Sequence, residues 1–388
     1  MTGERRLRDT MARTLHVLLL GLVPVALAAG AWRLERDRPG WLVEPGSRSA
    51  PPRSIPAPTL PKLVLAVHYP WYGTPTGPAR RWRHWNHRIE ILPDERILGF
   101  HDPRRSAEPG RLDIAAVHYP DGGPYDSRDP ARIRAQLEQA RAAGLDGFAV
   151  SWWGHEAEEA LGLSALFRHA GDAGLVLAPY YETGELWRRG AFGVAADLER
   201  LLDRHGDDPA WLRVDQRPVV FLYASHRLRP RAWDAVMARL AARKRRVFFV
   251  ADVPSPEWLA SRPDWLRRFD ALHVYTPAVF LRRGRDLGEV YATLANLGRA
   301  AGRPFVPPVG PGFDDRPVRT PATLIARAGG AAYDKTWEAA LETDPRWVLV
   351  STWNEWHEGS EIEPSIEQGR RYLDATRAWA ERFRGRPS

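Results

Sequence analysis

Residues 127–153 read SRDPARIRAQLEQARAAGLDGFAVSWW and combine the pattern of one helix with that of one buried strand. Asp129 and Pro130 are typical of a helix start, apolar residues then recur at helical spacing, and Gly144 ends the pattern. The apolar run at 147–153 follows directly, and because it is uninterrupted by polar residues at alternate positions, it does not fit a strand with one solvent-exposed face. The stretch therefore predicts an α/β unit whose strand belongs to a parallel sheet.

Seven further apolar runs of this kind occur along the chain. They cover residues 63–69, 175–181, 218–224, 247–253, 271–276, 304–309 and 347–353. Helical patterns separate most of them, at residues 157–170, 192–205, 232–242, 286–301, 321–341 and 365–383. Because parallel strands need a crossover connection, eight buried strands alternating with helices predict a (β/α)₈ (TIM) barrel. The competing doubly wound sheet would require a glycine-rich phosphate turn after the first strand, and HYPWYG at 68–73 is not one.

Residues 70–127, between the first strand and its helix, are too long for a plain connection. We expect them to form an insertion over one end of the barrel. The apolar run at 114–119 predicts an added hairpin strand within that insertion.

The N-terminal region carries the features of a targeting segment. Four arginines precede an apolar run at 15–32, and charged residues follow it. Residues 1–32 are therefore interpreted as a signal peptide or an uncleaved N-terminal membrane anchor, and both place the rest of the chain outside the cytoplasm, in the periplasm or extracellular space. Residues 33–61 are rich in proline and arginine and predict a linker, which leaves 62–388 as the barrel domain.

The composition of the 388 residues excludes several classes of function. There is no cysteine, which rules out thiol nucleophiles, cysteine–zinc sites and disulfides. The formal charge of +8 comes from arginines scattered among acids, so a nucleic-acid partner is not expected. No helical His-Glu-x-x-His spacing occurs, and we predict neither a metal nor a cofactor. The 17 tryptophans favour a groove that binds a ligand.

Side chains at the carboxyl ends of barrel strands meet at one rim, where barrel enzymes have their active sites. Here these positions are polar or aromatic: His68, Tyr69, Trp152, Trp153, Tyr180, Tyr181, Glu182, Tyr223, Asp252, His273 and Tyr275. Glu355 and Glu358 follow the last strand, three residues apart. Aromatic faces suit sugar rings, and glycoside hydrolysis uses one carboxyl as proton donor and a second group to activate a nucleophile.

Beyond these positions, the chain resembles glycoside hydrolase family 99 over roughly residues 63–375. The resemblance rests on ordered motifs: HYPWYG at 68–73, HWNH at 84–87, YPDGGPYDS at 119–127, SWW at 151–153, PGFDD at 311–315 and WNEWHEG at 353–359. The family resemblance implies an endo-α-mannosidase that acts on mannan-like glycans. The chain departs from the usual pattern at 319–322 and at 359–363, which bears on the substrate more than on the reaction.

The resemblance also implies roles for individual residues. Glu355 would act as a base on the 2-hydroxyl of the substrate, giving a 1,2-anhydro sugar, and Glu358 would act as general acid and base. The sugar-binding shell would comprise His68, Tyr69, Trp152, Trp153, Tyr181, Glu182, Tyr275, Arg319, Asn354 and Trp356.

Two other interpretations stay open on the residues alone. One is a carbohydrate-binding or surface-polysaccharide assembly protein without turnover. The other is an ordinary two-carboxylate hydrolase in which Glu182 or Asp252 works with Glu358. We expect an oligo- or polysaccharide as the partner, contact with a membrane only through the N-terminal segment, and a monomer.

Overall fold

The computed structural model describes residues 60–94, 96–183 and 189–385. All elements named below belong to one compact unit. The predictions for residues 1–32, and most of the predicted linker, lie outside the described residues. Within these ranges, no helix has the length and apolar character needed to cross a bilayer.

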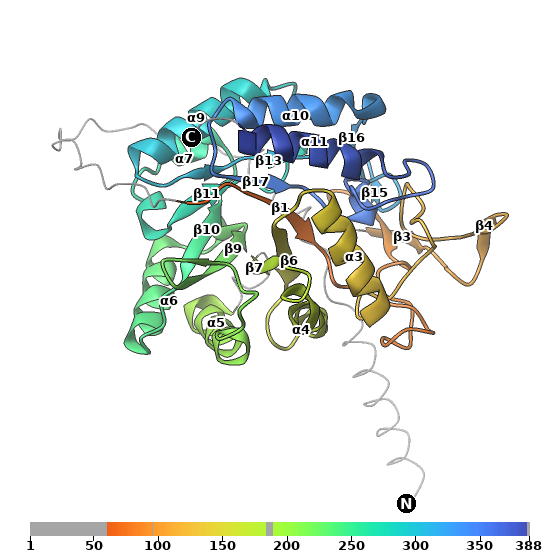
Figure 1. Ribbon diagram of the computed structural model, residues 1–388, viewed down its shortest axis with the longest axis horizontal. Helices are drawn as coiled ribbons and strands as arrows, with labels where there is room; N and C mark the ends of the chain where they lie inside the picture. Colours follow the sequence, from red (N-terminus) through yellow and green to blue (C-terminus); the bar gives the residue numbers. More distant parts are fainter. Residues whose placement is uncertain (1–59, 95, 184–188, 386–388) are drawn as a thin grey trace, which may run out of the picture. The chain divides into compact units, whose positions relative to one another are not determined.

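Eight parallel strand positions form a closed ring, which confirms the predicted barrel (Figure 1). In ring order the strands are β1 (Leu63–His68), β6 (Gly147–Trp152), β7 (Val176–Glu182), β9 (Arg217–Tyr223), β10 (Phe248–Asp252), β11 (Ala271–His273), β12 with β13 (Phe305–Val306 and Pro308–Val309), and β17 (Trp347–Val350). β12 pairs with β11, and β13 pairs with β17, which returns to β1. The seventh position is split because Pro307 and Pro308 have no amide hydrogen to donate.

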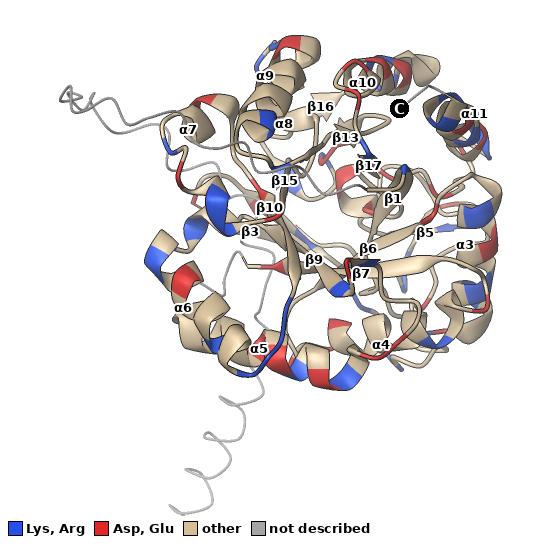
Figure 2. Ribbon diagram, turned by 60° about the vertical axis from the view of Figure 1, so that its left-hand side comes forward, with Lys and Arg blue, Asp and Glu red and all other residues tan. Residues whose placement is uncertain are grey.

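Helices surround this ring on the outside (Figure 1). They are α3 (Pro130–Ala142), α4 (Glu159–Ala170), α5 (Gly190–His205), α6 (Pro230–Ala242), α7 (Pro256–Ala260), α8 (Ala278–Leu281), α9 (Leu287–Ala300), α10 (Ala331–Leu341) and α11 (Arg371–Gly385). The start of α3 is as predicted, because the Asp129 carboxylate accepts the Ala131 N–H at 2.8 Å and Pro130 occupies the first turn. Basic and acidic residues are interspersed on the helices (Figure 2).

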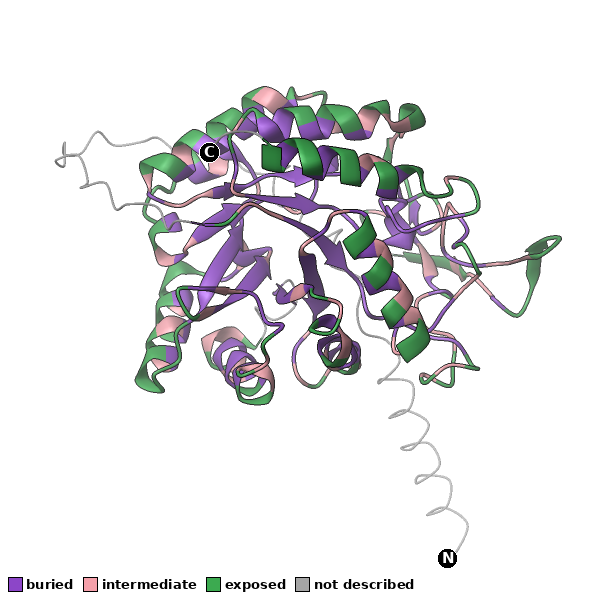
Figure 3. Cartoon of the chain, viewed as in Figure 1, coloured by how far each residue is buried: buried purple, intermediate pink, exposed green. Residues whose placement is uncertain are grey.

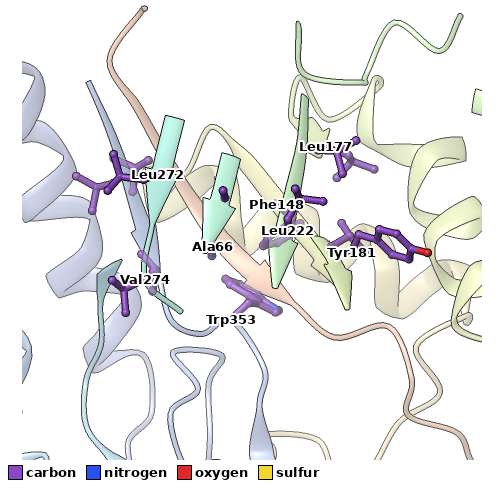
Figure 4. Close-up of a cluster of buried hydrophobic side chains, with 14 of the residues drawn as sticks. Ala66, Phe148, Leu177, Tyr181, Leu222, Leu272, Val274 and Trp353 are labelled. Atoms are coloured by element: carbon purple, nitrogen blue, oxygen red, sulfur yellow. The ribbon is translucent and has the colours of Figure 1, made fainter. Parts of the chain in front are cut away.

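The strands are buried on both faces, whereas the helices bury only their inner sides (Figure 3). One set of alternating side chains packs against the helices and includes Ala66, Phe148, Leu177, Leu222 and Leu272 (Figure 4). The other set fills the barrel and includes Leu65, Val67, Ala149, Ala178, Phe221 and Val250. Because successive residues of a strand point to opposite faces, the parity of a position decides which side its side chain reaches.

The insertion after β1 contains two small sheets. β2 (Arg88–Ile91) pairs with β3 (Arg96–Phe100) and also with β15 (Arg319–Thr320), while β4 (Ser106–Glu108) pairs with β5 (Arg111–Leu112). The prediction of a strand at 114–119 was wrong. The backbone there bonds to distant loops instead, as in Ala115 N–H to the Trp85 carbonyl at 2.9 Å and Ile366 N–H to the Tyr119 carbonyl at 2.8 Å.

Two predicted helix boundaries were also wrong. The helix predicted at 321–341 begins only at Ala331, because β16 (Leu324–Ile325) pairs with β14 (Phe313–Asp314) and the next residues turn at Gly329 and Gly330, with φ of +66° and +112°. The helix predicted from residue 365 begins at Arg371, after Gly369 with φ of +53°.

Candidate active site

The loop after β17 presents both candidate carboxylates on one turn of 3₁₀ helix, Trp356–Glu358. The Glu355 N–H donates to the Thr352 hydroxyl at 2.8 Å, which anchors the start of the turn. Gly359 ends it with φ of +53°, and an added Cβ there would lie 3.0 Å from the Asp314 carbonyl oxygen. Local geometry therefore holds Glu355 and Glu358 in one rigid segment.

Glu355 is buried and faces its own turn. Its Oε1 accepts the His357 backbone N–H at 3.2 Å and lies 3.2 Å from Nδ1 of the same histidine. Burial raises the pKa of Glu355 to about 8, and the nearby charge of Arg319 only partly opposes this.

Glu358 is held from both sides of its carboxyl group. Oε1 accepts from Arg319 Nη1 at 3.0 Å, and Oε2 accepts from the Tyr275 hydroxyl at 3.1 Å. The Tyr69 hydroxyl donates in turn to Tyr275 at 2.8 Å. Burial raises the pKa of Glu358 to about 7, against the lowering effect of Arg319. Such a group can give up or take a proton near neutral pH.

The insertion positions Arg319. The residue lies on β15, in register with Glu90 of β2, and its guanidinium also donates to Asp315 at 3.0 Å. Arg319 is 8% exposed, so its charge acts on Glu358 in a poorly hydrated environment.

Two further acids come from inside the barrel. Glu182 accepts from the Ser151 hydroxyl at 2.8 Å, and burial raises its pKa to about 8, with the charges of Glu355 and Glu358 adding to the effect. Burial likewise raises the pKa of Asp252 to about 7. The electrostatic coupling between these acids shows that Glu182 lies in the same region as the two glutamates.

Aromatic rings accompany the acids. Trp153 is half-buried and donates its indole N–H to Ser151 at 3.2 Å. Trp71 lies 4.4 Å from the Tyr69 ring and stacks on His84, also at 4.4 Å between centroids. Flat aromatic surfaces beside carboxyl groups suit a sugar ligand.

Several predicted shell residues are brought together and several are not. Tyr69, Trp153, Glu182, Tyr275 and Arg319 lie with the two carboxylates. His68, Trp152 and Tyr181 do not, because their parity turns them towards the helices.

His68, Trp152 and Tyr181 have contacts on the helix-facing side of the strands. His68 Nε2 lies 3.2 Å from Gln136 Oε1 on α3, and the Tyr181 hydroxyl donates to Asp197 on α5 at 2.7 Å. The Trp152 ring packs on Tyr181 at 4.8 Å. These three side chains point away from the two carboxylates, since a strand cannot point consecutive residues to one face, and their sugar contact stays a prediction.

Asn354 and Trp356 are fully buried and satisfied by the protein. Asn354 accepts the Tyr69 N–H at 2.7 Å and donates to the Tyr69 carbonyl at 2.9 Å and the Tyr125 hydroxyl at 3.1 Å. The Trp356 indole donates to the same hydroxyl at 3.2 Å. These two side chains therefore support the site through hydrogen bonds within the protein.

Four residues outside the predicted shell also belong to this region: Trp71, Tyr180, Asp252 and His357. The Tyr180 hydroxyl is buried with no hydrogen-bond partner among the described residues. Tyr180 was among the strand-end positions named from the sequence, and parity was the signal that separates it from Tyr181, because Tyr180 shares the inward face with Glu182. Within the described ranges, no group of three or more His, Asp or Glu side chains is arranged to hold a metal ion.

Comparison with known proteins agrees with this geometry. Residues 59–384 match the sequence profile of Glycosyl hydrolase family 99. The glycoprotein endo-alpha-1,2-mannosidase of Rattus norvegicus is 26% identical over 362 residues, with 84% of this chain and 76% of the relative covered. A glycoprotein endo-alpha-1,2-mannosidase-like protein of Homo sapiens is 25% identical over 361 residues, with 82% and 75% covered.

A solved structure has the same fold. The GH99 endo-alpha-mannosidase from Bacteroides thetaiotaomicron superimposes with a TM-score of 0.71 at 24% identity, over 84% of this chain and 98% of that one. The family resemblance drawn from the motifs is confirmed. The chain belongs to glycosyl hydrolase family 99 and is a glycoside hydrolase.

Proposed function

We propose that the protein is an endo-acting, retaining α-mannosidase that cleaves α-1,2 linkages within mannan-like glycans. The observation that carries this proposal is the pair of buried carboxyl groups on one turn, Glu355 and Glu358, whose pKa values burial raises into the neutral range. The rat relative, a glycoprotein endo-alpha-1,2-mannosidase that aligns over most of both chains, supports the choice of linkage.

In the proposed first step, Glu355 removes the proton from the sugar 2-hydroxyl. That oxygen attacks the anomeric carbon while Glu358 gives its proton to the leaving glycosidic oxygen, and a 1,2-anhydro sugar results. In the second step, Glu358 takes a proton from water, which opens the epoxide at the anomeric carbon, and Glu355 returns its proton to the 2-oxygen. Two inversions at one carbon leave the configuration retained.

The surroundings of Glu358 support its role as the acid. A proton donor must be protonated at the working pH and must lose its proton readily, which a carboxyl with a pKa of about 7 can do. Arg319 and Tyr275 each hold one of its oxygens, so the group is oriented before substrate arrives.

A protein nucleophile is the main alternative, because Glu182 lies in the same region and is coupled to both glutamates. Substrate assistance requires no such nucleophile. Replacement of Glu182 therefore separates the two mechanisms, provided that the hydrogen bond with Ser151 is preserved, as glutamine can do.

The test uses α-1,2-linked manno-oligosaccharides, with products followed by mass and anomeric NMR. We expect internal cleavage with retained α-configuration, lost in both Glu355→Gln and Glu358→Gln and largely kept in Glu182→Gln. A substrate whose attacking 2-hydroxyl is replaced by hydrogen should resist cleavage. Cleavage of that substrate, together with loss of activity in Glu182→Gln, would favour the two-carboxylate mechanism, and binding without cleavage would favour a carbohydrate-binding protein.

Export is part of the same proposal. Basic residues ahead of the apolar run at 15–32 support translocation of the barrel domain, through a cleaved signal or a retained anchor. Protease accessibility in intact cells expressing the full chain tests this, and protection of the barrel until the cells are lysed would contradict it.

A further inference from the structure

The His357 imidazole bridges Glu355 and the insertion. Its Nε2 lies 2.8 Å from the His84 carbonyl oxygen, and its Nδ1 lies 3.2 Å from Glu355 Oε1. The ring is 3% exposed and packs against His87 at 4.6 Å and Trp71 at 5.8 Å between centroids. Both ring nitrogens are therefore committed, and their partners differ in chemistry.

These partners determine where the imidazole carries its hydrogen. A backbone carbonyl oxygen can only accept, so Nε2 must be the protonated nitrogen. In a neutral imidazole Nδ1 is then a lone-pair acceptor facing Glu355 Oε1. Two acceptors at 3.2 Å repel, and the contact becomes a hydrogen bond when a proton lies between them.

The surroundings of the Glu355–His357 pair disfavour the binding of a second proton to it. The charge of Arg319 on β15 disfavours a positive charge on His357, while the hydrogen bond with the His84 carbonyl and the charge of Glu358 on the same turn favour one. Burial has the largest effect and lowers the pKa of His357 to about 4, and the charge of His101 acts in the same direction. A neutral His357 beside a protonated Glu355 is the resting arrangement that these groups support.

We propose that Glu355 and His357 share a single proton, and that His357 is the positioning residue that holds this proton at Nδ1 while Glu355 acts as a carboxylate. In this transfer the O–H bond of Glu355 breaks and an N–H bond forms at Nδ1, so the total charge of the pair is unchanged. The consequence for catalysis rests on the proposed function, whereas the position of the proton is independent of it.

The first test reads the proton directly and needs no substrate. Histidine-specific ¹⁵N NMR of the full chain between pH 5 and 9 gives the tautomer, and the signals absent from His357→Asn identify this ring among the 12 histidines. We expect hydrogen on Nε2 and an acceptor Nδ1 at neutral pH. Raising the pH should shift the Nδ1 signal once, as the shared proton leaves, and Glu355→Gln should abolish that shift. Hydrogen on Nδ1 alone, or the same titration in Glu355→Gln, would overturn the proposal.

The second test uses the pH dependence of kcat/KM. The side-chain amide of His357→Asn cannot take the proton of Glu355, so Glu355 must lose that proton to solvent before it can act as a carboxylate. We expect the acidic limb to move up by at least one pH unit, whereas His87→Gln, a neighbour that does not bond to Glu355, should leave it in place. A variant that is merely slower, with unchanged limbs, would contradict the proposal. If no glycan is cleaved at all, the proposed function fails, and the NMR result still stands alone.

Discussion

Replacement of Asn354 by alanine should destabilise the barrel strongly, although the residue lies next to a candidate catalytic acid. Its side-chain amide ties the loop after β17 to the end of β1 through the Tyr69 N–H and carbonyl, at 2.7 and 2.9 Å. Alanine cannot replace either bond. Because Asn354 is fully buried, water cannot reach the two backbone groups without opening the loop.

The magnitude follows from those two groups. Leaving a buried polar group without its partner costs about 1–3 kcal/mol. Two orphaned groups therefore predict a loss of about 2–6 kcal/mol in the free energy of unfolding, before any cost of the small cavity. This is a large share of the roughly 5–15 kcal/mol that keeps a typical domain folded.

Urea unfolding, followed by tryptophan fluorescence, measures this loss. Asn296→Ala is the matched control, since Asn296 is exposed on α9 and its side chain accepts from the nearby Arg299 at 2.6 Å. Its effect should stay within about 0.5 kcal/mol. If Asn354→Ala unfolds at the same urea concentration as this control, the Asn354 amide does not stabilise the contact between the loop after β17 and the end of β1. The predicted role of Asn354 in sugar binding would then be favoured.

Three further predictions concern charge and backbone. Arg319→Gln removes the cation that lowers the pKa of Glu358, so that pKa should rise above about 7 and the alkaline limb of kcat/KM should move to higher pH; an unchanged limb would refute the coupling. Because burial raises the pKa of Glu182 to about 8, its protonated form favours folding at low pH, and this contribution is lost as the pH rises from about 4.5 through 8. Urea titrations of Glu182→Gln should thus show less loss of stability between pH 5 and 8 than the wild type, and parallel curves would contradict the shift. Gly359→Ala should cost about 1–3 kcal/mol more than Gly369→Ala in the same assay, because both have φ of +53° but only the first added Cβ meets a backbone oxygen, at 3.0 Å; equal losses would show that packing is not involved.

Much of the fold could be predicted because its signals are local. The run at 147–153 and the capped helix before it are recognisable from neighbouring residues, and the same pattern repeats around the barrel. The boundaries at 331 and 371 could not be read this way. Glycines with positive φ and a distant strand pairing override helical periodicity there.

The site was predictable in part for the same reason. Glu355 and Glu358 belong to one short motif after a strand, so both were located from the sequence. Arg319 was named from the family resemblance, but its contact with Glu358 depends on the insertion, which pairs β2 with β15 across more than 200 residues of chain.

Sequence alone determined the barrel, the strand ends and the candidate carboxylates, because apolar periodicity and strand–loop junctions are properties of adjacent residues. Only the tertiary structure decided which side chains face the site and in which protonation state. Tyr180 and Tyr181 are adjacent, yet one faces the acids and the other bonds to α5. Burial raises the pKa values of Glu355 and Glu358, and the His84 carbonyl of the insertion, which lies far away along the chain, fixes the hydrogen of His357.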